Sequence, residues 1–276
     1  MNLIVQGLEV NNSDLRAVAK LARADGIERI TGQAFRLTNA AYSDEIPRYC
    51  AEAELDFAFV DAERKLADFK LIAMDMDSTL LAIESIDEIA DMLQIKPQVA
   101  AITLQTMRGE ISFEESLARR TQLLKGLHQD ALQQVYDERV RLSPGAEKML
   151  LQAKQAGLKT MVISGGFTFF TERIKVKLGF DYAAANVLAI ENQRLTGEVV
   201  GEIIGREGKA RVLQQVRDEL GLQREHIIAI GDGANDLGMI AEAGVGIAYH
   251  AKPIVKAHAT YALDYVGLDG VINLFK

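Results

Sequence analysis

The chain has 276 residues and an acidic balance, with 31 lysines and arginines against 39 aspartates and glutamates and a formal net charge of −8. This charge argues against binding to nucleic acid or to an anionic membrane surface, because both require a positive field. Hydrophobic residues make up 49% of the sequence, and charged residues interrupt every apolar run before it reaches membrane-spanning length. We therefore expect a globular protein that does not cross a membrane.

The cysteine content and the N-terminus indicate a cellular compartment. Cys50 is the single cysteine, so no internal disulfide can form, and the first residues lack the basic and apolar segments of a secretion signal. With four histidines and one cysteine, a zinc site is improbable. We expect a cytoplasmic protein.

Residues 1–66 predict a small α+β module. Three strand-like runs, at residues 3–5, 30–37 and 57–60, alternate with two helical patterns that begin near Ser13 and Ser43. Gly26 is placed to end the first helix in a left-handed conformation. The charged residues 61–65 then predict a linker.

Residues 67–276 predict an α/β domain. Short, wholly apolar runs occur at 71–74, 160–163, 227–230 and 245–248, as expected of strands that are buried on both faces. Helical patterns lie between them, at 146–156, 209–220 and 237–243. This alternation is typical of a doubly wound, Rossmann-like parallel sheet.

Two segments depart from this alternation. Residues from about 85 to 142 show only helical patterns, at 86–93, 98–107, 113–124 and 130–139, directly after the first core strand. An insertion of this length predicts a separate helical cap over the edge of the sheet. The second departure is a hairpin pattern, at residues 183–190 and 195–203.

Polar residues gather where the predicted core strands end. Such sheets bind ligands outside the carboxyl ends of their strands. The segments found there are Asp75-Met76-Asp77-Ser78-Thr79, Ser164-Gly165-Gly166 and Gly231-Asp232-Gly233-Ala234-Asn235-Asp236, and Lys209 opens a further helix. Carboxylates at 75, 77 and 232 form an oxygen-rich cluster suited to Mg²⁺, which together with Lys209 could hold a phosphoryl group.

Taken together, these motifs resemble those of the haloacid-dehalogenase-like phosphohydrolases. The pattern Asp75-x-Asp77-x-Thr79, then Ser164, Lys209 and Gly231-Asp232-Gly233-x-Asn235-Asp236, follows the family's four motifs in order. The resemblance covers roughly residues 70 to 265. Any one motif is weak, but four in the right order at strand ends are specific.

The resemblance implies a role for each motif residue. Asp75 would attack phosphorus and form an aspartyl-phosphate, and Asp77 would act as general acid and then general base. The Asp75 and Asp232 carboxylates and the Asp77 main-chain carbonyl would hold Mg²⁺. The remaining residues would hold phosphoryl oxygens or orient substrate and metal-bound water: Ser164, Lys209, Asn235, Asp236 and Thr79.

A narrower resemblance concerns the substrate. Glu84, then Met107, Phe113 and Arg120 in the insertion, are similar to residues of family members that hydrolyse O-phospho-L-serine in the last step of serine biosynthesis. Glu84 would take the ammonium group and Arg120 the carboxylate, which a guanidinium can hold through two parallel bonds. Met107 and Phe113 would line the pocket, Gly165 would offer a backbone contact, and the cap would close over the substrate.

Plainer interpretations exist for single residues. The Asp75/Asp77 pair alone could belong to a turn, and Lys209 alone could be a solvated lysine at a helix start. Glu84 and Arg120 could be surface charges, Met107 and Phe113 could be core residues, and spacing does not tell Arg119 from Arg120.

Alternatives also remain open for the whole protein. The substrate could be another phosphorylated amine or amino acid, such as phosphohomoserine or phosphoethanolamine, or the aspartyl-phosphate could pass to an alcohol. The N-terminal module resembles a reduced form of amino-acid-binding regulatory domains, with three strands in place of four. It could sense a ligand, form a homodimer or simply pack on the core.

Overall fold

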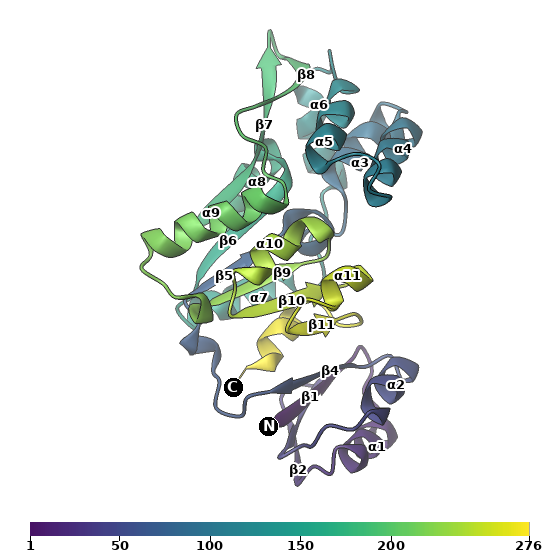
Figure 1. The fold of residues 1–276 in the computed structure, drawn as a ribbon, viewed down its shortest axis with the longest axis vertical. Coiled ribbons are helices and arrows are strands. Elements are labelled where there is room, and N and C mark those ends of the chain that lie inside the picture. The colour runs from purple at the N-terminus through teal and green to yellow at the C-terminus, as the bar shows by residue number, and fades with distance from the viewer. Residues whose placement is uncertain (276) are drawn as a thin grey trace.

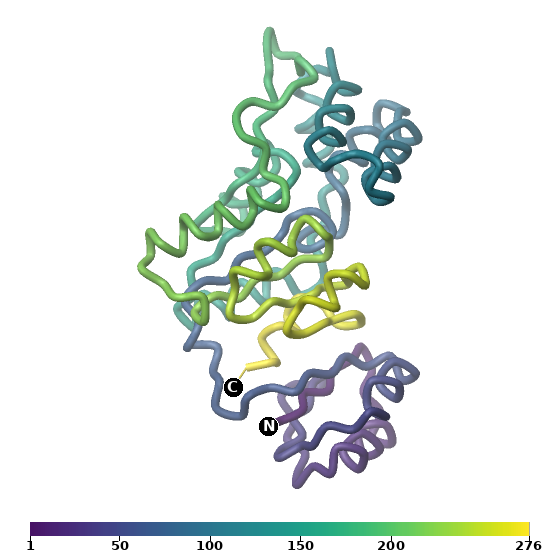
Figure 2. The backbone as a smooth tube through the Cα atoms, viewed as in Figure 1, coloured from purple at the N-terminus to yellow at the C-terminus, as the bar shows by residue number. Residues whose placement is uncertain are grey.

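Two sheets organise residues 1–275, the part of the chain that the computed structural model describes. One sheet has four strands and belongs to the N-terminal module, and the other has seven and forms the core. The module lies at one end of an elongated molecule and a group of helices lies at the other, with the seven-stranded sheet between them (Figures 1 and 2).

The N-terminal module is an antiparallel sheet with two helices. Its strands pair in the order β2-β3-β1-β4, and its buried apolar side chains include Leu3, Leu15 and Ile46. The elements in chain order are β1 (Asn2–Gln6), α1 (Asn12–Leu21), β2 (Gly26–Arg29), β3 (Ala34–Thr38), α2 (Glu45–Glu52) and β4 (Asp56–Val60).

The structure corrects two expectations for this module. The prediction of three strands is wrong, because residues 26–38 form a hairpin in which Gly26 pairs with Thr38 and Arg29 with Phe35. Gly26 accordingly lies in β2 and does not end the helix. The left-handed residue after α1 is Arg23, with φ 50°. The missed strand β2 is an edge strand and mostly exposed, so it lacks the apolar alternation by which a strand is detected.

The core sheet contains the four predicted parallel strands. The strand order is β11-β10-β9-β5-β6-β7-β8, and only β8 runs antiparallel to its neighbour. The strands are β5 (Leu71–Met74), β6 (Lys159–Phe167), β7 (Tyr182–Glu191), β8 (Arg194–Val200), β9 (Ile227–Gly231), β10 (Val245–Tyr249) and β11 (Tyr261–Leu263). The predicted hairpin is β7 and β8.

Helices cover both faces of this sheet, as its buried strands require. Leu71 and Ala73 of β5 share a cluster with residues of α9 (Arg206–Glu219), α10 (Leu237–Ala241) and α11 (Pro253–Lys256). Ile72 and Met74 point to the other face and share a cluster with α7 (Ala146–Gln155) and α8 (Thr168–Leu178). Helix α9 begins at Arg206, so Lys209 does not open the helix as expected but lies within it.

The insertion after β5 consists of four helices and the loops between them. It contains α3 (Ser85–Met92), α4 (Lys96–Met107), α5 (Phe113–Gln122) and α6 (Asp130–Arg139). The chain enters and leaves this cap side by side, because Leu81 bridges Leu142 and the Ser143 N–H donates to the Leu80 carbonyl at 2.9 Å. At its far side the cap contacts β8 through a bond from the Gly126 N–H to the Leu195 carbonyl, at 2.8 Å.

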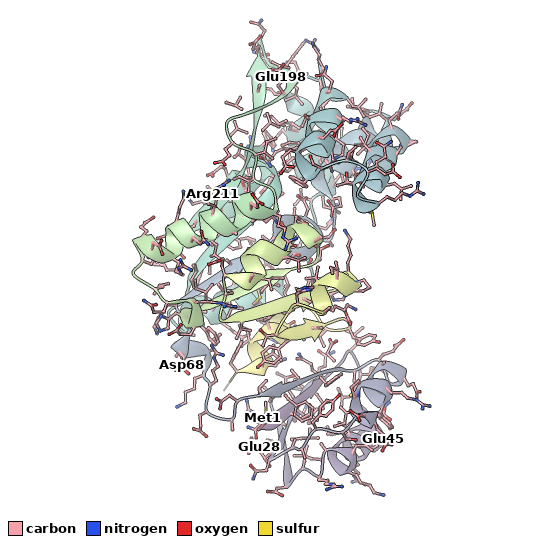
Figure 3. The ribbon with its side chains drawn as sticks, in the orientation of Figure 1. Met1, Glu28, Glu45, Asp68, Glu198 and Arg211 are labelled. Atoms are coloured by element: carbon pink, nitrogen blue, oxygen red, sulfur yellow. The ribbon has the colours of Figure 1, made fainter. Side chains whose placement is uncertain are left out.

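The module docks on the core through buried polar groups. The carboxylate of Asp56, at the start of β4, accepts the backbone N–H groups of Asp264, Tyr265 and Val266 at 2.6, 3.0 and 3.0 Å. Burial raises the pKa of Asp56, and these three donors oppose that rise. Asp68, labelled in Figure 3, lies on the connection between module and core. Across residues 1–275 we find no helix with the length and apolarity to cross a membrane.

We predict that Asp56→Ala destabilises the protein, because three backbone N–H groups lose their acceptor at a site where Asp56 is only 4% exposed. The free energy of unfolding should fall by about 2–3 kcal/mol, as measured by urea denaturation. The matched control is Asp61→Ala in the exposed linker, which should change it by less than about 0.5 kcal/mol. Equal stability of the two variants would contradict the docking role.

Candidate active site

The candidate site lies where the order of the core strands reverses. From β5 the chain builds β6 on one side and later β9 on the other, which makes the β5/β9 boundary the switch point of the sheet. Ligands of open α/β sheets bind at this point, outside the carboxyl ends of the strands. Asp75 directly follows β5 and Asp232 directly follows β9.

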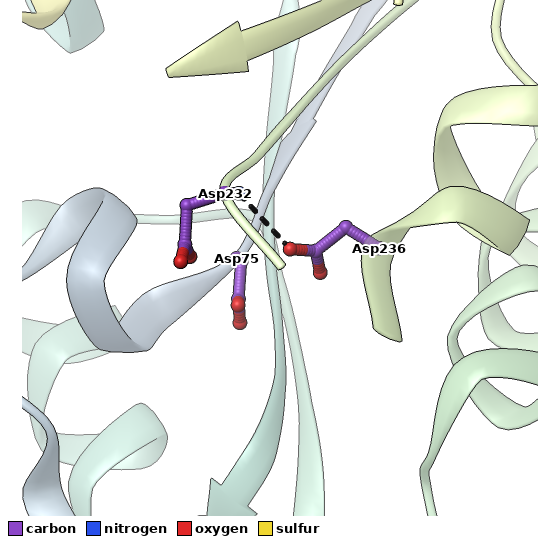
Figure 4. A group of neighbouring side chains, drawn as sticks. All are labelled: Asp75, Asp232 and Asp236. Carbon is purple, nitrogen blue, oxygen red and sulfur yellow. Dashed lines mark hydrogen bonds between the residues drawn. The ribbon is translucent and has the colours of Figure 1, made fainter. Parts of the chain in front are cut away.

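Three carboxylates meet at this point (Figure 4). Asp75, Asp232 and Asp236 each offer an oxygen, and these oxygens lie within 4.8 Å of one another. Asp236 is fully buried and also accepts the backbone N–H groups of Asp232 and Gly233, at 3.1 and 2.9 Å. Asp236, predicted from the sequence only as a supporting residue, thus belongs to the cluster itself.

Lys209 is the cation of the cluster. Its side chain is fully buried, and its Nζ lies 2.6 Å from Asp75 Oδ1 and 2.7 Å from Asp236 Oδ1. A lysine is rarely buried unless it is paired. The interpretation of Lys209 as a solvated helix-start residue is therefore wrong.

The cluster carries more negative than positive charge, and the pKa values reflect this. Burial and the neighbouring Asp236 raise the pKa of Asp75 well above its usual value, against the opposing effect of Lys209. Burial and Asp236 likewise raise the pKa of Asp232 to about 6. For Lys209, burial lowers the pKa, but the carboxylates of Asp236 and Asp75 outweigh it and the net shift is upward.

This donor set fits a divalent cation. Mg²⁺ binds carboxylate oxygens and keeps several waters, so a few convergent carboxylates suffice. One lysine leaves the three carboxylates undercompensated, and a hard cation would remove that excess charge. The grouped carboxylates of Asp75, Asp232 and Asp236 are thus consistent with a metal site.

Asp77 faces the same site from the loop after β5. Its Oδ1 accepts the Ser85 N–H at 2.7 Å, and its Oδ2 accepts the Ser164 hydroxyl at 3.2 Å. Gly166 is required here, since a Cβ at that position would lie 2.7 Å from Asp77 Oδ2. Burial, with the nearby charge of Glu84, raises the pKa of Asp77 to about 7. An acid of that pKa can both give and accept a proton near neutrality.

The loop itself has an unusual backbone. Ser78 adopts a left-handed conformation with φ 57°, which is uncommon for a residue with a side chain. Its hydroxyl donates to Glu84 Oε1 at 2.6 Å, which connects the loop to the start of the cap. Thr79 donates from Oγ1 to Asp232 Oδ1 at 3.1 Å and so connects the loop to the cluster.

Of the two adjacent arginines, Arg120 is the one directed inward. Arg120 is half-buried, and its Nε donates to the Ser116 carbonyl at 3.3 Å. Burial lowers its pKa, while the charges of Glu84, Asp87 and Asp77 act in the opposite direction. Arg119 is exposed and pairs with Glu115 on the surface of α5, at 2.6 Å. The structure thus distinguishes the inward-facing Arg120 from the exposed Arg119, which their adjacent positions in the sequence do not.

The remaining predicted residues differ in their placement. Phe113 packs over Gly165 and Gly205, where an added Cβ would lie 2.9 and 2.8 Å from its ring, so Phe113 joins the cap to the core. The Asn235 amide folds back over Gly233 within the β9 loop. Met107 ends α4 with 65% of its surface exposed, so its assignment to a pocket stays a prediction.

Ser85 is a site residue that the sequence analysis missed. Its N–H holds Asp77, and it is the first residue of α3. The pattern Ser85-Ile86-Asp87-Glu88 matches the S/T-x-x-E signature of a helix start and could have drawn attention to it, although the N-cap in the structure is Glu84 and no capping bond forms.

Comparison with known proteins agrees with this geometry. A family model described as haloacid dehalogenase-like hydrolase matches residues 72–241, more than half of the chain. A second model, described as a domain of unknown function (DUF4072), matches residues 3–48. The phosphoserine phosphatase of Polaromonas sp. is 50% identical over 217 residues, which cover 77% of this chain and 92% of the relative.

Solved structures extend the similarity to the whole chain. A HAD family hydrolase from Salmonella enterica serovar Typhi superposes with a TM-score of 0.89 at 32% identity, covering 100% of this chain and 98% of the other. A phospho-aspartyl intermediate analogue of phosphoserine phosphatase superposes with a TM-score of 0.71 at 38% identity, covering 75% and 99%. The chain therefore belongs to the haloacid dehalogenase-like hydrolase family, and within it to the group of the phosphoserine phosphatases.

Proposed function

We propose that the protein hydrolyses O-phospho-L-serine to L-serine and phosphate, with Mg²⁺ as cofactor and an aspartyl-phosphate at Asp75 as intermediate. The observation that carries the proposal is the buried Asp75 carboxylate, held 2.6 Å from Lys209 inside a cluster with Asp232 and Asp236. The names of the relatives, phosphoserine phosphatases, support the choice of substrate. The reaction would be the last step of serine biosynthesis.

The residues divide the chemistry between them. An Asp75 oxygen bonds to phosphorus as the bond from phosphorus to the seryl oxygen breaks, and Asp77 gives its proton to that oxygen. The resulting Asp77 carboxylate then takes a proton from the water that releases phosphate from Asp75. When bound, Mg²⁺ supplies positive charge beside the phosphoryl group and would be held by the Asp75 and Asp232 carboxylates and the Asp77 main-chain carbonyl.

The surrounding side chains position the substrate. Lys209 and Ser164 would hold phosphoryl oxygens, and Asn235 would orient the bound group, with Thr79 and Asp236 in support. Glu84 would receive the substrate ammonium and Arg120 its carboxylate, because the two have opposite charge and both lie near Asp77. Phe113 and Met107 would shield the pocket when the cap closes, and Gly165 would offer a backbone contact.

We also propose a division of the chain into residues 1–66, a small module, and residues 67–276, the phosphatase core with its cap at about 85–142. The module has the strand and helix order β-α-β-β-α-β and docks through the buried Asp56, which favours a packing role. Calorimetric titration with serine would detect the alternative sensing role, and the sedimentation coefficient would detect a homodimer. The buried, unpaired Cys50 supports a cytoplasmic location.

We predict that Asp75→Asn abolishes turnover, because the amide is a poor nucleophile of nearly the same size. Phosphate release from O-phosphoserine should fall by about a thousandfold or more. The control Asp218→Asn, on the exposed side of α9, should keep the wild-type rate. Near-normal turnover by the Asp75→Asn variant would refute the role of Asp75 as the nucleophile.

We predict that Arg120→Gln raises KM for O-phosphoserine by about 10- to 100-fold, because the bonds to the substrate carboxylate are lost. The adjacent, exposed Arg119→Gln is the matched control and should leave KM unchanged. Phosphoethanolamine lacks the carboxylate, so its rate should not respond to either variant. An unaltered KM in Arg120→Gln would overturn the carboxylate contact.

We predict that the stability of the metal-free protein falls as the pH rises from about 4 to about 7. The pKa values of Asp232 and Asp77 are raised from 3.8 to about 6 and about 7, so the folded state keeps protons that the unfolded chain has lost. Their contribution is complete below about pH 4 and disappears above the folded-state values. Mg²⁺ competes with these protons, so it should raise Tm more at about pH 8 than at about pH 5.

Thermal unfolding with EDTA or with Mg²⁺ checks this prediction at both pH values. Asp232→Asn removes one of the raised groups and should reduce the Mg²⁺ effect. If Mg²⁺ raises Tm equally at both pH values, the predicted competition between Mg²⁺ and protons is contradicted.

A further inference from the structure

The segment that follows β11 is held from two sides. On one side, the Asp56 carboxylate of the N-terminal module accepts the N–H groups of Asp264, Tyr265 and Val266. On the other side, His250 Nε2 lies 2.9 Å from the Val266 carbonyl. A carbonyl oxygen can only accept, so Nε2 carries the proton in this bond.

His250 joins this segment to the end of β10. Its backbone N–H donates to the carbonyl of Leu263, the last residue of β11, at 2.7 Å, and its side chain binds the stretch after β11. His250 adopts a left-handed conformation with φ 44°. Such a conformation is unfavourable for a histidine and persists where the surroundings hold it.

Two residues after His250 the chain reaches the carboxylate cluster. The Lys252 N–H donates to the main-chain carbonyl of Asp232 at 3.0 Å. The Asp232 N–H is instead bound within its own loop, by Asp236 at 3.1 Å. Lys252 thus ties the main chain of Asp232 to the segment after β10.

We propose that Asp56 and His250 are positioning residues for the metal site. Asp56 fixes the segment 264–266, His250 binds that segment, and the turn from His250 to Lys252 sets the position of the Asp232 carbonyl and hence of its carboxylate. The N-terminal module, at the far side of β11, thereby acts on a metal ligand that it does not touch. The inference rests on the proposed function only in taking the carboxylate cluster as the metal site.

Metal binding by the full-length protein tests the proposal without substrate. The probe is Mn²⁺, whose free concentration is followed by electron paramagnetic resonance. We expect Asp56→Asn and His250→Ala to weaken Mn²⁺ binding by about fivefold each, because each variant removes at least one hydrogen bond of the coupled pathway. Because both act through the same bonds, the double variant should be little weaker than either single variant.

Two sets of control variants separate this pathway from general damage. Gln6 also joins the module to the core, through the Gly270 carbonyl at 3.1 Å and Asn273 at 2.8 Å, and among the described residues no hydrogen bond joins it to residues 264–266. Gln6→Ala should leave Mn²⁺ affinity unchanged. His250→Gln retains a donor near the Nε2 position and should recover most of the affinity. His250→Asn tolerates the left-handed backbone but is too short, and should behave as His250→Ala.

Coupling between two sites is reciprocal, which gives a second measurement. Saturating Mg²⁺ should slow hydrogen exchange at the amides of Asp264, Tyr265 and Val266 by about fivefold in the wild type. In His250→Ala these amides should exchange at the same rate with and without Mg²⁺.

The outcomes distinguish this proposal from the proposed function. If Asp232→Asn binds Mn²⁺ as the wild type does, the cluster is not the metal site and the proposed function fails with it. If Asp232→Asn loses the metal while Asp56→Asn and His250→Ala keep full affinity, only the positioning role fails. If Gln6→Ala weakens Mn²⁺ binding as much as Asp56→Asn does, the positioning role also fails, because general loosening of the module on the core would then explain the effect.

Discussion

The structure of the site depends on one buried ammonium group shared by two carboxylates. Lys209 Nζ lies within 2.7 Å of both Asp75 and Asp236, and Asp232 completes the cluster. The charge of Lys252 opposes the rise of the Asp232 pKa, but no ion pair joins the two among the described residues. Removing one partner of a buried ion pair leaves an uncompensated charge, which is costly in a low-dielectric interior. The strand ends that carry Asp75 and Asp232 must therefore keep their places relative to α9, which carries Lys209. The cluster retains a negative excess that a cation or a proton can offset.

Much of the fold could be predicted because parallel strands leave a strong local signal. The strands β5, β6, β9 and β10 are apolar on both faces, and each appeared as a short, continuous apolar run. The cap could be predicted because residues from about 85 to 142 contain no such apolar run. Strand β2 was not, since its residues are mostly exposed and pair only with β3. The start of α9 was misplaced because Arg206 is polar and exposed, like a loop residue.

The site was predictable to the extent that its residues lie next to strand ends. Asp75, Asp77 and Asp232 follow β5 and β9, so topology alone brings them together. The choice between Arg119 and Arg120 depends on how α5 rotates against the loop after β5, which neighbouring positions in sequence cannot specify. The share of Asp236 in the cluster depends on the turn after β9, where its carboxylate accepts two backbone N–H groups.

The two attachments of the core sheet differ in the hydrogen bonds that accompany their apolar packing. At the β8 edge the cap is joined by backbone bonds and by an apolar cluster in which Leu117 and Leu124 of the cap are buried together with Leu195 of β8. The chain enters and leaves the cap at the bridge between Leu81 and Leu142. At the β11 edge the module is joined by the buried Asp56 with three donors. The proposed closure of the cap over the substrate would require these contacts to shift or β8 to move with the cap. The proposed positioning role of Asp56 would instead require the module to stay in place. The central strands β5 and β9 thus carry the carboxylate cluster between the edge that meets the cap and the edge that meets the module.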